Sequence, residues 1–138
     1  MYISNTLKIK IYYEDTDAGG VVYYANYLRY LERARTELLM ENGINVAEYH
    51  KRGYLFAVVH VDIHYKKPVT LGEIIEVRTE IIEITNVTIT LMQRVFRGEM
   101  TLVEATVKLA CLNTDGKPQR LPAAFTSLLS KKYNPVWL

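Results

Sequence analysis

Apolar and polar residues alternate in five stretches of the sequence, which is the period of β-strands with one buried face. Turn-forming residues at Pro68, Gly72, Asn86 and Gly98 separate most of them. Because the last four stretches are joined by short connections, we expect antiparallel neighbours. The predicted strands are Leu7–Tyr13, Leu55–Tyr65, Glu73–Ile84, Val87–Phe96 and Thr101–Leu112.

The period changes to that of a helix after Asn26. One apolar stripe recurs there at a spacing of three and four residues, and it consists of Tyr27, Tyr30, Leu31, Ala34 and Leu38. Asn26 is a candidate N-cap and Gly43 a candidate residue just beyond the helix end. A helix of about 17 residues would be about 25 Å long. Residues 46–53 read as a polar connection, and residues 122–130 as a short terminal helix.

These elements predict an α+β fold, in which one long helix covers the apolar face of an antiparallel sheet. A length of 138 residues predicts a single domain spanning residues 1–138. Seventeen basic and fifteen acidic residues give a net charge of +2, which argues against a nucleic-acid partner. The sequence shows no apolar run long enough for a membrane span, and its one cysteine suits a reducing compartment. We therefore predict a cytoplasmic protein.

The segment Tyr13–Glu37 carries the candidate chemistry. Glu14, Asp15 and Asp17 lead into a Gly-Gly pair, and the long helix begins shortly afterwards. The glycines allow a ligand to approach the backbone, and the helix start offers unpaired N–H groups with a partial positive charge. Taken alone, the pattern favours an ordinary turn residue at Asp17.

The run from Asp15 to Tyr27, DTDAGGVVYYANY, resembles the signature of the 4-hydroxybenzoyl-CoA thioesterase family of hotdog-fold enzymes. The continuation ERARTE at residues 32–37 is similar to the acyl-CoA thioesterase branch encoded beside the Tol–Pal genes in many bacteria. The end of the second predicted strand, residues 65–68, is similar to the family as well. The resemblance covers nearly the whole chain, and residues 15–27 are its specific part.

The resemblance implies a hotdog fold, a curved antiparallel sheet of about five strands wrapped around one long helix. It also implies a homodimer or homotetramer with sites at subunit interfaces, no metal, and no cofactor other than the CoA of the substrate. The expected activity is hydrolysis of a small-to-medium acyl-CoA thioester. The alternatives are a hotdog hydratase or dehydratase, and a non-catalytic protein that binds acyl thioesters or an acyl carrier.

The family's catalytic carboxylate falls on Asp17, and the backbone N–H that polarises the thioester carbonyl falls on Tyr24. The related branch often has histidine at position 24, so a backbone role survives this difference but a histidine side-chain role does not. We expect no catalytic role for Glu14 or Asp15. The candidate substrate-binding residues are Gly20, Val21, Val22, Tyr23 and Asn26, the last as a cap or as a tether for the loop.

Other reactive side chains have simpler interpretations. His60, Asp62 and His64 alternate on one face of a predicted strand, but no further ligand pattern completes a metal site. Cys111 lies in a strand pattern without a paired base, which favours a core thiol. Six cations are candidates to contact the CoA phosphates, namely Lys66, Lys67, Arg94, Arg97, Lys131 and Lys132.

Overall fold

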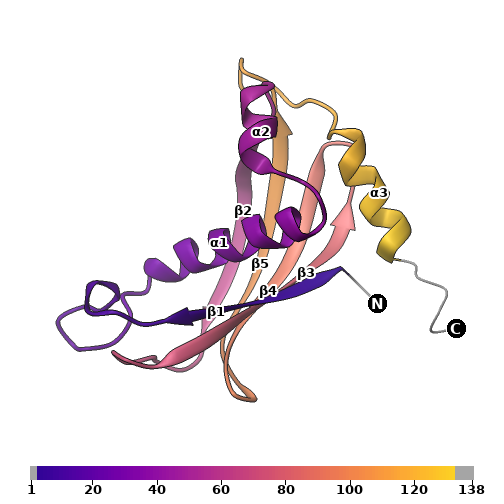
Figure 1. Ribbon diagram of the computed structural model, residues 1–138. Helices are drawn as coiled ribbons and strands as arrows, with labels where there is room; N and C mark the ends of the chain where they lie inside the picture. Colours follow the sequence, from indigo (N-terminus) through magenta and orange to yellow (C-terminus); the bar gives the residue numbers. More distant parts are fainter. Residues whose placement is uncertain (1–2, 133–138) are drawn as a thin grey trace, which may run out of the picture.

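The computed structural model describes residues 3–132, with side chains described as far as residue 128. Five antiparallel strands form one curved sheet, β1 (Ser4–Lys10), β2 (Leu55–Tyr65), β3 (Ile74–Ile84), β4 (Thr88–Arg97) and β5 (Met100–Leu112). The long helix α1 (Asn26–Glu41) crosses the concave face of this sheet, as Figure 1 shows. The predicted α+β class and the wrapping of the sheet around one helix are therefore confirmed.

The order of the strands is β1-β3-β4-β5-β2, so β2 and β3 are not neighbours although only eight residues connect them. The prediction that short connections join antiparallel neighbours is wrong here. Instead, β2 pairs with β5, and β3 lies between β1 and β4. The connection, residues 66–73, crosses the end of the sheet, and its Gly72 N–H donates to Ile11 O at 3.0 Å.

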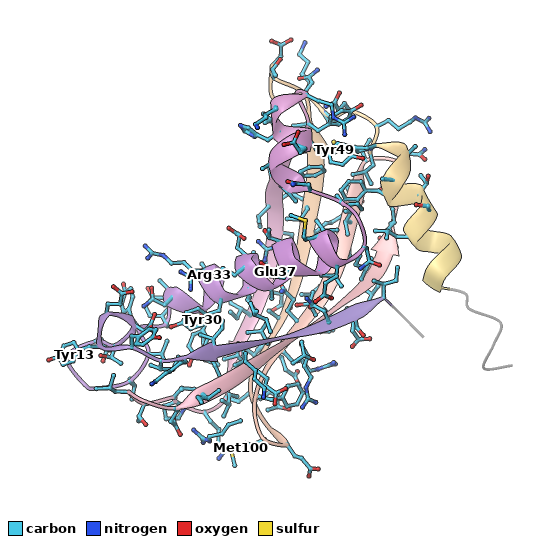
Figure 2. The ribbon with its side chains drawn as sticks, in the orientation of Figure 1. Tyr13, Tyr30, Arg33, Glu37, Tyr49 and Met100 are labelled. Carbon is cyan, nitrogen blue, oxygen red and sulfur yellow. The ribbon has the colours of Figure 1, made fainter. Side chains whose placement is uncertain are left out.

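The helix covers the sheet with the stripe that the sequence predicts. Tyr27, Tyr30, Leu31, Ala34 and Leu38 are all buried, and the inward residues of β3, β4 and β5 are buried beneath them. Burial of such a continuous apolar interface supplies most of the driving force for folding. Figure 2 shows Arg33 and Glu37 on the exposed side of α1, whereas Tyr30 belongs to its buried side.

Two of the differences from the predicted elements have a local cause. The first strand ends at Lys10, because the Asp15 carboxylate accepts the Tyr12 N–H at 2.7 Å and draws the chain into a turn. The predicted polar connection contains a helix, α2 (Val46–Lys51), whose first turn is capped by Asn45 accepting the Glu48 N–H. The helical signal was missed because six residues are too few to show the period of an amphipathic stripe.

The terminal helix α3 (Ala123–Lys132) confirms the predicted short helix. Its Phe125 is fully buried, with ring centroids 5.2 Å from Phe56 of β2 and 6.1 Å from Tyr49 of α2. These rings join α2, α3 and β2 at the end of the sheet where Tyr49 is labelled in Figure 2. None of the helices within residues 3–132 is long and apolar enough to cross a membrane.

Strand β2 forms a free edge of the sheet and contains a bulge. Its register against β5 shifts between Val58 and His60. The side chains opposite the buried residues of β5 are therefore Phe56, Val58, Val61, Ile63 and Tyr65, so Val59 does not share their face as the simple alternation predicts. Val58 is 47% exposed and Val61 36% exposed, which leaves an uncovered apolar strip.

Candidate functional site

The segment between β1 and α1 is a compact turn organised by Asp15. A short 3-10 helix, Tyr13–Asp15, opens it, and Figure 2 shows Tyr13 at its outer end. The Asp15 carbonyl accepts two hydrogen bonds at 2.9 Å, from the Tyr23 N–H and from Asn26 Nδ2. Asn26 is the first residue of α1 and follows an N-cap at Ala25, so it is not the cap that its sequence position suggests. Its side chain ties the helix start to the loop.

The Asp17 carboxylate lies exposed at the tip of a second, tighter turn. The Asp17 N–H donates to Val21 O at 2.9 Å, and the Gly20 N–H donates to Asp17 O at 3.0 Å. Oδ1 of Asp17 accepts the Gly19 N–H at 2.8 Å, which fixes the orientation of the carboxylate. A Cβ at Gly19 would lie 3.3 Å from that same oxygen, and Gly20 has a φ of +76°, so both positions favour glycine.

The crossover connection between β2 and β3 fastens this turn to the sheet. The Val22 N–H donates to Val69 O at 2.8 Å, and both residues are buried. Val21 forms an isolated antiparallel bridge with Thr70. Residues 66–70, which belong to the connection between β2 and β3, therefore lie beside the turn.

The first N–H groups of α1 donate to carbonyls of the residues that precede the helix, beginning with the Asn26 N–H to Tyr23 O at 2.9 Å. The Tyr27 N–H donates to Tyr24 O at 3.3 Å and the Leu28 N–H to Ala25 O at 3.2 Å. The N–H groups of Tyr24 and Ala25 precede this ladder, so they have no intrahelical acceptor. They lie at the positive end of the helix dipole, where developing negative charge is stabilised.

A cavity of about 220 Å³ lies next to the Tyr24 backbone. Its walls come from the turn, α1, the end of β2 and the crossover, and they consist of Val22, Tyr24, Tyr27, Tyr65, Lys66, Lys67 and Pro68. The Tyr65 hydroxyl donates to Tyr24 O at 3.3 Å, and the Tyr65 ring lies 6.0 Å from that of Tyr24 and 5.6 Å from that of Tyr27. Burial, followed by the neighbouring Tyr65, raises the pKa of Tyr27 to about 12.

Two residues expected at the site from the sequence, Val22 and Tyr24, line this cavity. The other expected site residues, Asp17, Gly20, Val21, Tyr23 and Asn26, are not part of its walls, although the Tyr23 ring contacts that of Tyr24 with centroids 5.0 Å apart. The sequence analysis did not identify Tyr27, Tyr65 and Pro68 as wall residues. Tyr65 could have been found, since the alternation of its strand places it on the inward face just before a proline.

The six candidate cations differ in their surroundings. Lys66 pairs with Glu104 at 3.2 Å and Arg97 with Glu73 at 2.8 Å. Arg94 lies 3.5 Å from Glu80. Lys67 lines the cavity and takes part in none of the ion pairs found among the described side chains. The side chains of Lys131 and Lys132 lie outside the described part of the chain.

The remaining reactive groups lie elsewhere. His64 Nε2 is 2.9 Å from Asp62 Oδ1 on the exposed outer face of β2. Among the residues that the structure describes, no group of three or more His, Cys, Asp or Glu side chains is placed to hold a metal ion. Cys111 is fully buried, and burial raises the pKa of its thiol, which fits a core residue.

Comparison with known proteins places the chain in a family. The sequence profile of the thioesterase superfamily matches residues 19–104. An acyl-CoA thioesterase YbgC of Haemophilus influenzae is 40% identical over 127 residues, covering 87% of this chain and 93% of that protein. An acyl-CoA thioester hydrolase YbgC of Escherichia coli O6:H1 is 36% identical over 121 residues, covering 86% of this chain and 90% of that protein.

The fold supports the same family assignment as the sequence. The crystal structure of a DHNA-CoA thioesterase from Staphylococcus aureus superimposes with a TM-score of 0.88 at 25% identity, covering 93% of this chain and 89% of that one. The curved five-stranded sheet around α1 is thus the hotdog fold. The sequence match and the shared architecture together show that this chain belongs to the thioesterase superfamily.

Proposed function

We propose that this protein hydrolyses small-to-medium acyl-CoA thioesters to the free acid and CoA, through Asp17 and the backbone amide of Tyr24. The observation that carries the proposal is the hydrogen bonding that ties the loop carrying Asp17 to the start of α1. Hydrogen bonds among Asp15, Tyr23 and Asn26 hold both in one rigid unit beside a cavity. The names of the curated relatives support acyl-CoA as the substrate class.

Thioester hydrolysis requires stabilisation of the negative charge that develops on the carbonyl oxygen. A free N–H at a helix start supplies a fixed donor and the favourable end of the dipole, with no reorganisation during the reaction. In this proposal the Tyr24 N–H takes that role. The side chain of residue 24 then forms part of the cavity wall instead of taking part in the chemistry.

The Asp17 carboxylate supplies the second requirement. It acts either as the nucleophile, forming a mixed anhydride with the acyl group, or as the general base that activates a water molecule. The Gly19 N–H occupies Oδ1, so Oδ2 is the oxygen left for either role. Multiple turnovers in ¹⁸O-labelled water distinguish the routes, because label enters the Asp17 carboxylate itself only when a covalent anhydride is hydrolysed at that residue.

The CoA moiety requires cations for its phosphates. We propose Lys67 as the first contact, because it borders the cavity and has no carboxylate partner among the described ion pairs. Lys66, Arg94 and Arg97 would first have to leave their carboxylates. Val22 and the tyrosine rings then face the apolar part of the substrate.

We further propose that the active form is a homo-oligomer in which a second copy pairs with β2. The strand offers eleven residues of free edge and an uncovered apolar strip, a combination that is prone to association. A partner on this edge would complete the walls around a site that is open in one chain. Dimers and tetramers both satisfy this arrangement.

Two rival functions make different predictions. A hydratase or dehydratase uses a histidine acid–base group, but His50, His60 and His64 lie on α2 and β2, and none belongs to the loop between β1 and α1 that carries Asp17. A non-catalytic binder of acyl thioesters or acyl carriers predicts binding without turnover. An exposed carboxylate at Asp17, on a loop that hydrogen bonds tie to the helix start, favours hydrolysis over both.

The test is the Asp17→Asn variant assayed against a panel of acyl-CoA substrates. Asparagine keeps an oxygen that accepts the Gly19 N–H, so the turn persists while the ionisable group is lost. We expect kcat/KM to fall by roughly 100-fold or more, the scale of losing a positioned acid–base group. Glu14→Gln, an exposed carboxylate of the same loop, is the matched control and retains activity. Near-normal hydrolysis by Asp17→Asn would refute the assignment.

A further inference from the structure

A second cavity, of about 290 Å³, lies between α1 and the inward faces of β2 and β5. Five of its wall residues are apolar, and they are Leu39, Val46, Phe56, Val58 and Leu109. The polar walls are Glu32, Arg35 and Thr36, which lie within about one turn of α1. Arg35 lies nine residues beyond the helix start, about 14 Å along the axis. Within one chain this cavity is therefore separate from the Asp17 turn.

Arg35 is an unusual wall residue for such a cavity because it is only 9% exposed. Its Nη1 donates to Gln93 Oε1 at 3.1 Å, and Gln93 in turn donates to Leu31 O and to Thr79 Oγ1, both at 2.9 Å. Gln93 is neutral, so this network orients the guanidinium without neutralising it. Burial lowers the pKa of Arg35, while the nearby Glu32 carboxylate acts in the opposite direction.

Arg35 belongs to none of the ion pairs found among the described side chains. Glu32 is the nearest candidate, but its Oε2 accepts the Thr36 hydroxyl at 2.8 Å and is not in an ion pair with Arg35. A buried guanidinium costs several kcal/mol of solvation unless an anion compensates it. The cation is thus held by Gln93 at the wall of the cavity, where Glu32 is the nearby carboxylate.

We propose that this cavity binds a carboxylate carried on an apolar body, with Arg35 as its counter-ion. The planar guanidinium matches a carboxylate through two parallel hydrogen bonds, and the apolar walls suit a hydrocarbon chain or ring. A doubly charged phosphate fits less well, because Glu32 adds a negative charge at the same wall. The volume holds roughly ten non-hydrogen atoms at about 30 Å³ each.

Two sources present this chemistry. One is a free carboxylic acid of about six to eight carbons, the kind of product that thioester hydrolysis releases, since roughly ten non-hydrogen atoms fill the cavity. The other is the free carboxyl of a dicarboxylic acyl group. Because the cavity lies about 14 Å along α1 from the helix start of its own chain, this source alone rests on the proposed thioesterase activity and on the proposed second copy, whose Asp17 turn would have to lie nearby. Binding of a free acid needs no turnover, so its measurement stands even if the proposed function fails.

The first experiment titrates octanoate against neutral octanamide by calorimetry, using the parent protein, since neither compound is a thioester. We expect octanoate to bind measurably more tightly than octanamide. Arg35→Gln should weaken octanoate binding by roughly 10- to 100-fold, the scale of losing hydrogen bonds to a charged group. The matched control is Arg33→Gln, an exposed cation on the same helix, which should leave affinity unchanged.

Two further variants keep the test decisive if Arg35→Gln folds poorly. Arg35→Lys retains the charge and should bind octanoate with intermediate affinity. Glu32→Gln removes the competing negative charge and should strengthen binding. A comparison of adipyl-CoA with hexanoyl-CoA then identifies the source, because a kcat/KM preference for adipyl-CoA that Arg35→Lys reduces indicates the acyl group. Equal binding of acid and amide, together with no Arg35-dependent substrate preference, would overturn the proposal.

Discussion

The two edges of the sheet, β1 and β2, are built from similar alternating sequences but end up in opposite environments. β1 has seven residues, its inward side chains pack into the core under α1, and its outward positions include Lys8 and Lys10. β2 has eleven residues without any lysine or arginine, and Val58 and Val61 remain exposed on its inward face. Lysines on an edge oppose further strand pairing, and a long apolar edge favours it.

The difference shows that one helix cannot cover the whole concave face. α1 packs against β1 and β3, whereas Val58 and Val61 on the inward face of β2 remain exposed, and each cavity has walls from both α1 and β2. The covered side therefore provides stability. The uncovered side holds the candidate site, the Arg35 cavity and the edge at which we propose that a second copy binds.

The largest expected effect is a difference in the stability lost by substitutions on the covered and on the uncovered side of the sheet. Ile75→Ala in β3 removes a fully buried side chain and should lower the free energy of unfolding by about 2–5 kcal/mol. Val61→Ala in β2 should cost about 1 kcal/mol or less when the protein is a monomer, because the side chain is already 36% exposed. Chemical denaturation of both variants at low protein concentration provides the measurement. Equal losses would mean that β2 is as well covered as β3.

A charge on the β2 edge tests the proposed oligomer directly. Val61→Lys should raise the dissociation constant of the dimer by at least about 100-fold, or roughly 2.7 kcal/mol, because a buried ammonium lacks a partner. Thr6→Lys, an exposed position of β1, is the matched control at the other edge. Sedimentation equilibrium measures both. An unchanged mass for Val61→Lys would exclude β2 as the interface.

Alkaline pH gives the most gradual effect and examines the buried side of α1, which also forms a wall of the cavity beside Tyr24. Tyr27 lies on the buried side of α1, and its pKa is raised to about 12. It therefore stays neutral in the folded chain, while the same tyrosine in the unfolded chain ionises near pH 10. The unfolded state therefore loses protons first, and the free energy of unfolding should fall by about 1.4 kcal/mol per pH unit between pH 10 and 12.

Tyr27→Phe should remove this part of the pH dependence. Tyr13→Phe changes an 82% exposed ring in the loop and should leave the curve unchanged. Thermal melts at intervals across this pH range provide the measurement. The interpretation fails if Tyr27→Phe and the parent protein lose stability in parallel.

The sequence alone determined the local features, because their signals repeat over two, three or four residues. Alternation located the inward faces of β3, β4 and β5, and the helical stripe located the buried face of α1. The turn chemistry around Asp17 could likewise be read from neighbouring residues. These patterns depend on backbone geometry that every strand, helix or turn shares.

Only the tertiary structure decided the order of the strands, since pairing depends on which distant segments bury the most apolar surface together. The crossing of residues 66–73 places Tyr65 beside Tyr24, forty-one positions earlier. The same packing buries Arg35 against Gln93, although its charge places it among surface residues in a sequence-based reading. Local periodicity contains no information about either contact. The Asp17 turn was therefore predictable, whereas the cavity beside it and the buried cation were not.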